Sequence, residues 1–450
     1  MNHPLATALR SHPAGALSAK DVGAQVVLAG WVHSRRDHGG VYFFDLRDRS
    51  GLVQVVVHPD NASAFAIAAT LGAEYVVSVT GTVGKRPAGT ENAKIPTGEI
   101  EITVSQLRVL NSSKTLPFEI DEHTNVSEES RLKYRFLDLR RARMQGNLAL
   151  RHKVSQIVRR ELDREGFLEV ETPILTKATP EGARDFLVPS RLSPGTFYAL
   201  PQSPQIFKQI LMASGVERYF QLARAFRDED LRSDRQPEHT QIDLEMSFVE
   251  EKDVHGTVER FLKAVFKETM GVDLPTPFPC IEFEECLRRY GSDKPDLRYG
   301  YEIEDLTDVF NESQFKVFGE AARGGGVVRA LKCAADFSRA DIDKLPELAK
   351  TCGAKGLAWI KWEATGPQSP ILKFMSAAEI QGVQKSLNVA AGEYVFFAAD
   401  KKMPAATVLG AIRKELISKL KPQPSKAWSF HWVVHFPLLE WEPEEKRWTF

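Results

Sequence analysis

Apolar and polar positions alternate through five segments of the first 110 residues, with the period of two that is typical of half-buried β-strands. The five segments are residues 25–32, 41–46, 51–57, 74–83 and 98–110. A helical stretch over residues 61–71 separates the third segment from the fourth and stops at Gly72. This order predicts an all-β, five-stranded Greek-key barrel of the OB type in residues 1–110, and barrels of this type bind oligonucleotides on an exposed sheet face.

Beyond the barrel the pattern changes. Residues 111–130 are polar and turn-forming, which indicates a linker. The amphipathic pattern of residues 139–165 predicts a long helix, residues 167–175 are extended and broken by Pro173, and a second helix is expected over residues 253–270. The lack of regular βαβ spacing favours an α+β core with an antiparallel sheet over residues 131–289.

Glycine and alanine become frequent near residue 290, and the strand pattern of the core returns only at Trp428–Trp441. We therefore expect an inserted α+β domain in residues 290–425, with the core resumed in residues 426–450. Gly324–Gly326 lacks the spacing of a phosphate-binding loop, which favours a surface turn.

The composition is that of a globular chain of several domains, with 43% hydrophobic and 26% charged residues in 450. No apolar run is long enough for a membrane span, and the first twenty residues lack the apolar stretch of a signal peptide, so we expect a cytoplasmic protein without membrane contact. Four cysteines without CxxC spacing predict neither a disulfide nor a metal site: Cys280, Cys286, Cys333 and Cys352.

The net charge of −1 hides a basic run, because Arg131–Arg160 contains ten lysines and arginines and a single acid, Asp138. Such a run is either a solvated helix face or a surface that faces phosphates.

In the barrel, the segment Trp31–Asp48 combines aromatic residues with arginines. Phe43 is the natural platform for stacking a base, a contact that contributes about 1–3 kcal/mol. The alternative is a core aromatic; the neighbouring Arg35 and Arg36 favour the stacking role.

Three further clusters carry charged groups. The turn of residues 179–186 contains Glu181, which could reach a cationic ligand group. In residues 201–209, Ser203 resembles an N-cap and Pro204 a first helical residue. This places Gln205 and Lys208 on one helix face, which is suited to binding a carboxylate. The alternative is an ordinary capped helix.

In residues 226–245 a strand, a loop and a returning strand place Asp243 and Glu245 on one face, where they could orient Lys208. The alternative is a solvated hairpin.

Together these motifs resemble those of the class II aminoacyl-tRNA synthetases, and among them the bacterial-type aspartyl-tRNA synthetases. The resemblance covers nearly the whole chain and implies an anticodon-binding barrel, a class II core and an inserted GAD-like domain, whose relatives occur in tRNA-dependent amidotransferase subunits. It implies the ATP-dependent attachment of L-aspartate to tRNA(Asp) through aspartyl-adenylate. The competing interpretation is a non-catalytic tRNA-binding or regulatory paralogue. An asparaginyl or lysyl relative is a weaker alternative, because the insertion of residues 290–425 and the segment of residues 202–208 both resemble the aspartyl enzymes.

The resemblance also implies roles for single residues. Arg227 is the catalytic residue that binds the substrate carboxylate and the ATP α-phosphate, Glu229 contacts adenine, and Gln236 contacts ATP. Pro173 lies at the interface of a homodimer. The aspartate pocket comprises Glu181, Ser203, Gln205, Lys208, Arg227, Asp243 and Glu245, and the anticodon is read by Arg36, Phe43 and Gln54.

These roles agree with the chemistry. Adenylation brings two anions together, and the bidentate guanidinium of Arg227 suits that task. A cation facing the side-chain carboxylate separates aspartate from asparagine by charge, for which Lys208 is the candidate.

His38 and Gly89 match the residues found in members of the family with relaxed tRNA choice. His38 can donate or accept a hydrogen bond, and Gly89 has no side chain to exclude another base. The pair predicts that tRNA(Asn) is charged as well, which implies an amidotransferase in the same cell. The alternative is two turn residues without a reading role.

The family's Gly-rich third motif, with its ATP-binding arginine, does not occur before Phe450, and the protein ligands of the Mg²⁺ that accompanies ATP are expected beyond it. We therefore expect a fragment of a longer protein; the alternative is a naturally shortened paralogue.

Overall fold

The computed structural model describes residues 4–179, 181–230, 235–442 and 445–449. The chain forms two compact units, Met1–Val249 with Ala264–Val272, and Glu250–Lys263 with Asp273–Phe450. The finer domain boundaries predicted at residues 110, 130, 289 and 425 stay predictions.

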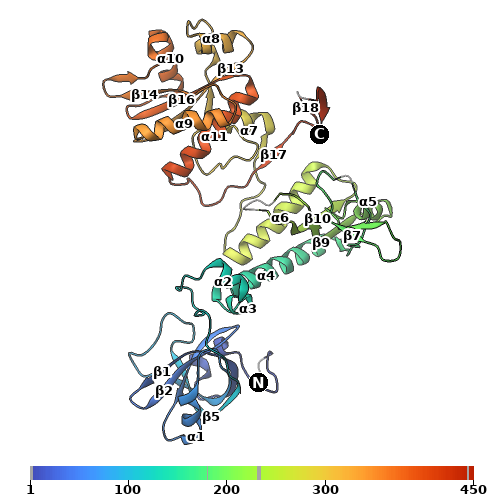
Figure 1. Cartoon of the computed structure of the whole chain (residues 1–450), viewed down its shortest axis with the longest axis vertical. Helices are drawn as coiled ribbons and strands as arrows, with labels where there is room; N and C mark the ends of the chain where they lie inside the picture. Colours follow the sequence, from blue (N-terminus) through green and yellow to red (C-terminus); the bar gives the residue numbers. More distant parts are fainter. Residues whose placement is uncertain (1–3, 180, 231–234, 443–444, 450) are drawn as a thin grey trace. The chain divides into compact units, whose positions relative to one another are not determined.

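The N-terminal segment is a closed five-stranded barrel with the strand order β1-β2-β3-β5-β4, as the alternating pattern predicts (blue in Figure 1). Its elements are β1 (Gln25–His38), β2 (Val41–Asp48), β3 (Gly51–Val57), α1 (Ala62–Thr70), β4 (Val76–Lys85) and β5 (Ile100–Asn111). Leu28, Phe44 and Ile102 are fully buried in the barrel core. β1 runs six residues past its predicted end because its pairing with β2 continues to His38, opposite Val41.

The next segment consists of helices and short strands around an antiparallel hairpin. Its elements are α2 (Glu128–Lys133), α3 (Arg135–Asp138), α4 (Ala142–Arg164), β6 (Leu168–Glu169), β7 (Leu187–Pro189), β8 (Phe197–Ala199), α5 (Gln205–Ala213), β9 (Arg218–Phe226), β10 (Glu238–Met246) and α6 (Glu251–Met270). The hairpin of β9 and β10 forms the antiparallel part of a sheet in which β6 pairs with β9 in parallel. The predicted antiparallel core is therefore present, with one parallel edge strand.

Most cations of the basic run of residues 131–160 have partners within the protein. Eight of its ten cations contact an acid, a hydroxyl or a carbonyl of the protein, namely Arg131, Arg135, Arg140, Arg141, Arg151, Lys153, Arg159 and Arg160. Most of these cations thus have a partner within the protein, yet Arg143, Arg151 and Lys153 are exposed, so part of the run is a solvated helix face. Asp138, inside the run, pairs with three of these cations, whereas Glu74 and Glu268 come from distant parts of the chain, so spacing alone does not reveal their partners.

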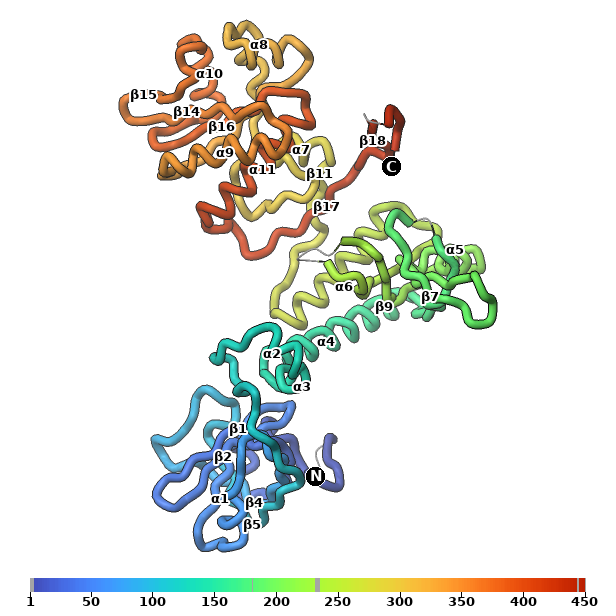
Figure 2. The backbone as a smooth tube through the Cα atoms, viewed as in Figure 1, coloured from blue at the N-terminus to red at the C-terminus, as the bar shows by residue number. Residues whose placement is uncertain are grey.

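The C-terminal part contains a five-stranded antiparallel sheet with the strand order β12-β13-β16-β14-β15, covered by helices. Its elements are β11 (Cys280–Glu282), α7 (Phe283–Tyr290), β12 (Ile303–Asp305), α8 (Lys316–Arg323), β13 (Val327–Ala334), α9 (Arg339–Thr351), β14 (Ala358–Glu363), β15 (Gly366–Gln368), α10 (Ala377–Leu387), β16 (Glu393–Asp400), α11 (Lys402–Leu420), β17 (Trp432–Val434), β18 (Glu440–Glu442) and β19 (Arg447–Thr449). β11 precedes this sheet along the chain and β17 follows it, and the two strands pair in parallel (Figure 2). Adjacent entry and exit strands are the geometry that an insertion requires.

Gly324–Gly326 forms the turn between α8 and β13, as its spacing predicts. The amides of Gly324 and Gly326 donate to the carbonyls of Glu320 and Ala321 and close the helix end. Gly325 has φ 78°, a left-handed conformation that favours glycine.

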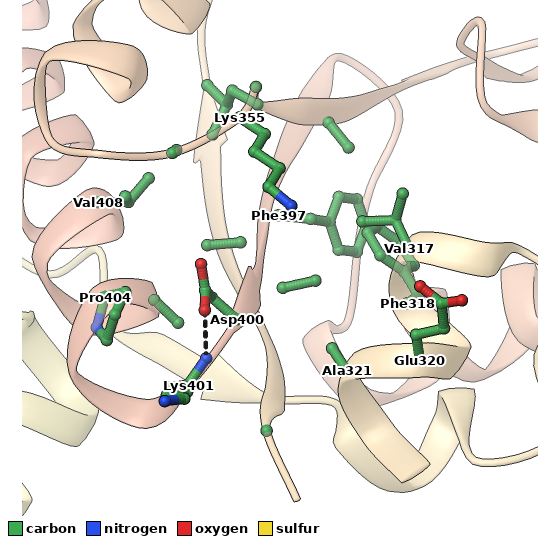
Figure 3. A pocket seen from close by; sticks show the side chains of 18 of the residues that line it. Val317, Phe318, Glu320, Ala321, Lys355, Phe397, Asp400, Lys401, Pro404 and Val408 are labelled. Atoms are coloured by element: carbon green, nitrogen blue, oxygen red, sulfur yellow. Dashed lines mark hydrogen bonds between the residues drawn. The ribbon is translucent and has the colours of Figure 1, made fainter. Parts of the chain in front are cut away.

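A cavity of about 640 Å³ lies among α8, the end of β16 and the start of α11 (Figure 3). Phe318 and Phe397 form part of its apolar wall, the side chain of Lys355 extends toward Phe397, and the carboxylate of Asp400 accepts a hydrogen bond from the Lys401 amide at 2.7 Å. All of its lining residues lie between residues 315 and 408, so it contains none of the predicted site residues.

Among the residues that the structure describes, no helix is both long and apolar enough to cross a membrane.

Candidate functional site

Lys208 is held by two acids of the hairpin. Its Nζ lies 3.0 Å from Asp243 Oδ1 and 3.1 Å from Glu245 Oε2. These two ion pairs join α5 to β10. The two acids share one face of the strand, as their spacing predicts. Lys208, Asp243 and Glu245 therefore form one ion-pair cluster, in which Asp243 is largely buried and Glu245 is half-exposed, and its binding of aspartate stays a prediction.

Burial alone would lower the pKa of Lys208, but the hydrogen bonds and charges of Asp243 and Glu245 outweigh it and leave this pKa above its ordinary value. Burial raises the pKa of Asp243, and Lys208 offsets this effect in part. Burial, followed by the charge of Asp243, raises the pKa of Tyr219 as well. Lys208 therefore stays cationic at neutral pH, and a ligand carboxylate would be the third carboxylate beside it.

Glu181 and Ser203 meet beside the start of α5. The Ser203 hydroxyl donates to Glu181 Oε2 at 2.9 Å and accepts from the Gln205 amide at 3.3 Å. α5 begins at Gln205, so Pro204 is the N-cap and not the first helical residue that the sequence predicts. The Ser203 side chain still binds the first turn, but its proton is directed to Glu181.

Backbone hydrogen bonds hold three of the predicted motifs together. The Phe226 amide donates to the Pro201 carbonyl at 2.9 Å, and the Asp228 amide donates to the Arg184 carbonyl at 3.0 Å. The turn that carries Glu181, the turn that carries Ser203 and the strand end that carries Arg227 are therefore neighbours, although they are far apart in sequence.

Two residues with no predicted role support this arrangement. Gln202, which is 1% exposed, exchanges hydrogen bonds with both backbone groups of Ala183 and donates to Asp185 Oδ1 at 2.6 Å. Tyr219, which is fully buried, donates to Gln221 Oε1 at 3.0 Å. Neither partner could be inferred from sequence spacing, although Gln202 stands inside the motif of residues 201–209.

Arg227 opens onto a cavity of about 390 Å³, and its Nε is buried without a hydrogen-bond partner among the described residues. This cavity is lined by Arg227, Glu229, Asp230, Arg235, Gln236, Pro237 and His239. The three residues predicted to contact ATP thus face one space. A buried guanidinium N–H with no partner is suited to an anionic ligand. The central part of the loop, residues 231–234, lies outside the described residues.

Pro173 is exposed in the extended segment that follows β6. Large apolar side chains around it are also exposed, namely Leu168 (57%), Ile174 (44%) and Leu175 (54%). A cluster of this kind is typical of a protein interface.

The strand pairing places Arg36, Phe43 and Gln54 on one outer side of the barrel, although Gln54 is only 8% exposed and donates to Glu101 at 2.9 Å. Phe43 pairs with Arg36 across β1 and β2 and is only partly buried, whereas the next residue, Phe44, fills the core. Phe43 is therefore not a core aromatic. Arg36 Nη2 contacts Gln54 Oε1 at 3.4 Å and Asp45 Oδ1 at 3.3 Å.

His38 lies beside Phe43, with ring centroids 6.1 Å apart in an edge-to-face arrangement. Gly89 has φ 85°, and a Cβ built on it would meet no atom within 4 Å. Backbone conformation alone accounts for a glycine at that position, so a reading role for Gly89 stays a prediction, while His38 lies on the predicted reading face.

Two family models match the chain. Residues 127–448 match the tRNA synthetases class II (D, K and N), and residues 26–110 match an OB-fold nucleic acid binding domain.

Curated relatives match along nearly the full chain. The Aspartate--tRNA(Asp/Asn) ligase of Moorella thermoacetica is 54% identical over 98% of this chain and 74% of its own length. The Aspartate--tRNA(Asp/Asn) ligase of Aquifex aeolicus is 51% identical over 97% of this chain and 73% of its own length.

Solved structures share the fold. The asparaginyl-tRNA synthetase of Pyrococcus horikoshii, complexed with asparaginyl-adenylate, matches with a TM-score of 0.52 and 19% identity over 87% of this chain and 93% of its own. That of Entamoeba histolytica, also in complex with asparaginyl-adenylate, matches with a TM-score of 0.51 and 15% identity over 86% of this chain and 92% of its own. With an OB barrel, an antiparallel core and family matches over both, the chain belongs to the class II tRNA synthetases of the D, K and N group.

Proposed function

We propose that the protein attaches L-aspartate to tRNA(Asp) and tRNA(Asn) in an ATP-dependent reaction that proceeds through aspartyl-adenylate. The observation that carries this proposal is the cationic Lys208, which Asp243 and Glu245 hold beside the turn of Ser203. The relatives named Aspartate--tRNA(Asp/Asn) ligase support both the amino acid and the pair of tRNAs.

In the proposed reaction an aspartate carboxylate attacks the α-phosphorus of ATP, a carboxyl–phosphate bond forms, and pyrophosphate leaves. Arg227 binds both anions and stabilises the negative charge that develops at the phosphorus. Lys208 binds the side-chain carboxylate of aspartate, and Glu181 closes over its ammonium group. Glu229 and Gln236 bind ATP from the cavity that they share with Arg227.

Class II synthetases use ATP, and we propose that Mg²⁺ accompanies it here. Within the described ranges, no three acidic, histidine or cysteine side chains are grouped so that they could hold a metal ion. We therefore assign no protein ligand to Mg²⁺ and route no step through it.

We propose a homodimer that forms through the exposed segment around Pro173, because the apolar cluster of Leu168, Ile174 and Leu175 would be covered there.

We also propose that the enzyme acts in the cytoplasm alongside a tRNA-dependent amidotransferase, which would convert aspartyl-tRNA(Asn) to asparaginyl-tRNA(Asn).

The test of the activity is ATP–pyrophosphate exchange by the full-length gene product. Exchange should depend on aspartate and be much weaker with asparagine. A protein that binds tRNA but catalyses no aspartate-dependent exchange would be the regulatory paralogue instead.

Both tRNAs should be charged at comparable efficiency. Their anticodons differ only in the third base, and His38 on the reading face offers a group that can either donate or accept a hydrogen bond. The measurement is kcat/KM with purified tRNA(Asp) and tRNA(Asn), and a preference for tRNA(Asp) above about 100-fold, equivalent to about 2.7 kcal/mol, would contradict relaxed recognition.

The His38→Leu variant should increase the preference for tRNA(Asp), because leucine cannot form the hydrogen bond. The matched control is His12→Leu, since His12 precedes β1 and bonds to Ser11 at 2.9 Å. An equal change in both variants would remove His38 from the recognition of the third base.

A further inference from the structure

The segment that connects the barrel to α4 is tied together by ion pairs around one acid. Asp138 is fully buried, and its carboxylate receives Arg131 at 2.8 Å and Arg135 at 2.6 Å. Arg141 lies 3.8 Å from the same carboxylate and also donates to the carbonyls of residues 121 and 124. The predicted linker therefore ends in an ordered hinge, here defined as residues 121–141, and not in a flexible tether.

One carboxylate of the barrel binds this hinge. Glu74 is 4% exposed, and its Oε2 accepts from Arg47 of β2 at 2.6 Å and from Arg140 of the hinge at 2.7 Å. The Arg140 guanidinium also lies over the ring of Trp31, 5.0 Å from its centroid. The hinge thus holds the barrel through a charge-assisted hydrogen bond and a cation–π contact at the same residue.

The backbone at Glu74 adopts a left-handed conformation that the surrounding structure must hold in place. Glu74 has φ 62°, which is unfavourable for a residue with a side chain, and its amide donates to the Val32 carbonyl at 2.7 Å. The Arg47–Glu74 pair lies within the barrel, whereas Arg140 comes from the turn just before α4. Loss of Arg140 therefore removes the hinge contact and leaves the pair inside the barrel intact.

We infer that Arg140 and Glu74 are positioning residues that hold the anticodon-reading barrel to the hinge, so that they determine tRNA charging and not adenylate formation. The inference rests on the proposed function. Its physical basis is that adenylation needs only the small substrates of the core, whereas charging needs one tRNA to engage the barrel and the core together. A loosened barrel would bind the anticodon equally well but present the tRNA less often in the productive orientation.

The test compares three activities of the Arg140→Ala variant of the full-length protein. We expect kcat/KM for tRNA(Asp) to fall at least tenfold, aspartate-dependent ATP–pyrophosphate exchange to stay within twofold, and affinity for an Asp anticodon stem-loop to stay within twofold. Arg140→Lys should recover part of the charging activity, because it keeps the ion pair while losing the planar contact with Trp31.

The matched control is Arg143→Ala. It removes the same charge three residues away, where the side chain has no partner among the described residues. Glu74→Gln provides a second variant, which should show the same separation between charging and exchange.

The inference would be overturned if kcat/KM for tRNA(Asp) in Arg140→Ala stayed within twofold of the parent value. It would also be overturned if Arg143→Ala lost as much charging activity as Arg140→Ala, because the effect would then come from the loss of positive charge near the RNA. Equal losses of charging and exchange would also overturn it, because they indicate general destabilisation. If the parent protein itself catalysed no aspartate-dependent exchange, the proposed function would fail, and this outcome is distinct from the other three.

Discussion

Replacing Arg227 with alanine should reduce aspartate-dependent ATP–pyrophosphate exchange by about 10³-fold or more, because the converging carboxylate and phosphate would lose their shared cation. Among the described residues the Arg227 Nε is buried without a hydrogen-bond partner, so this N–H is available to a ligand. We therefore expect the variant to fold normally, as measured by circular dichroism and thermal unfolding.

The matched control is Arg224→Ala, on β9, the strand that ends one residue before Arg227. Arg224 forms an ion pair with Glu238 and lines no part of the cavity around Arg227. Exchange by Arg224→Ala should stay near that of the parent. Exchange by Arg227→Ala within tenfold of the parent would contradict the catalytic role.

Replacing Lys208 with methionine should lower kcat/KM for aspartate by about 10³-fold, since truncating one partner of a buried, hydrogen-bonded charge pair at a binding site costs about 2–5 kcal/mol of binding free energy. Asp243 and Glu245 would then face the substrate carboxylate without a cation between them. The preference for aspartate over asparagine should fall with it, because asparagine carries no charge for Lys208 to bind. The measurement is exchange kinetics with both amino acids.

The pH dependence of this variant gives a second readout. Burial raises the pKa of Asp243, and Lys208 is the group that opposes this effect. Without Lys208, the Asp243 pKa should rise further, so protonation at lower pH should remove part of the repulsion and improve aspartate binding.

Two variants serve as controls for this experiment. Lys208→Arg keeps the charge and should lose less activity. Lys252→Met removes an exposed lysine of α6 and should behave as the parent does. An unchanged kcat/KM for aspartate in Lys208→Met would exclude the lysine from the pocket.

Much of the fold is predictable from local patterns. Alternation over residues 25–110 specifies five strands and their inward faces, and the barrel confirms both the strand order and the helix between the third and fourth strands. The period-two rule also places Asp243 and Glu245 on one face without any knowledge of their partner.

Other features depend on partners that are distant in sequence. The basic run of residues 131–160 is ambiguous as a sequence because Glu74, the acid that binds Arg140, lies 66 residues away. Pro204 marks a helix start, but whether it is the cap or the first residue depends on how the Ser203 hydroxyl is shared between Glu181 and the helix.

The sequence by itself determined the barrel, the antiparallel hairpin and the chemical types of the site residues, because periodicity and residue type act locally. Only the tertiary structure decided that Phe43 faces outward beside His38, that Lys208 lies between two acids, and that the hinge is bound to the barrel through Glu74. Hydrogen bonds and ion pairs weaken steeply with distance, so their partners are set by where packing brings distant segments together and not by spacing along the chain.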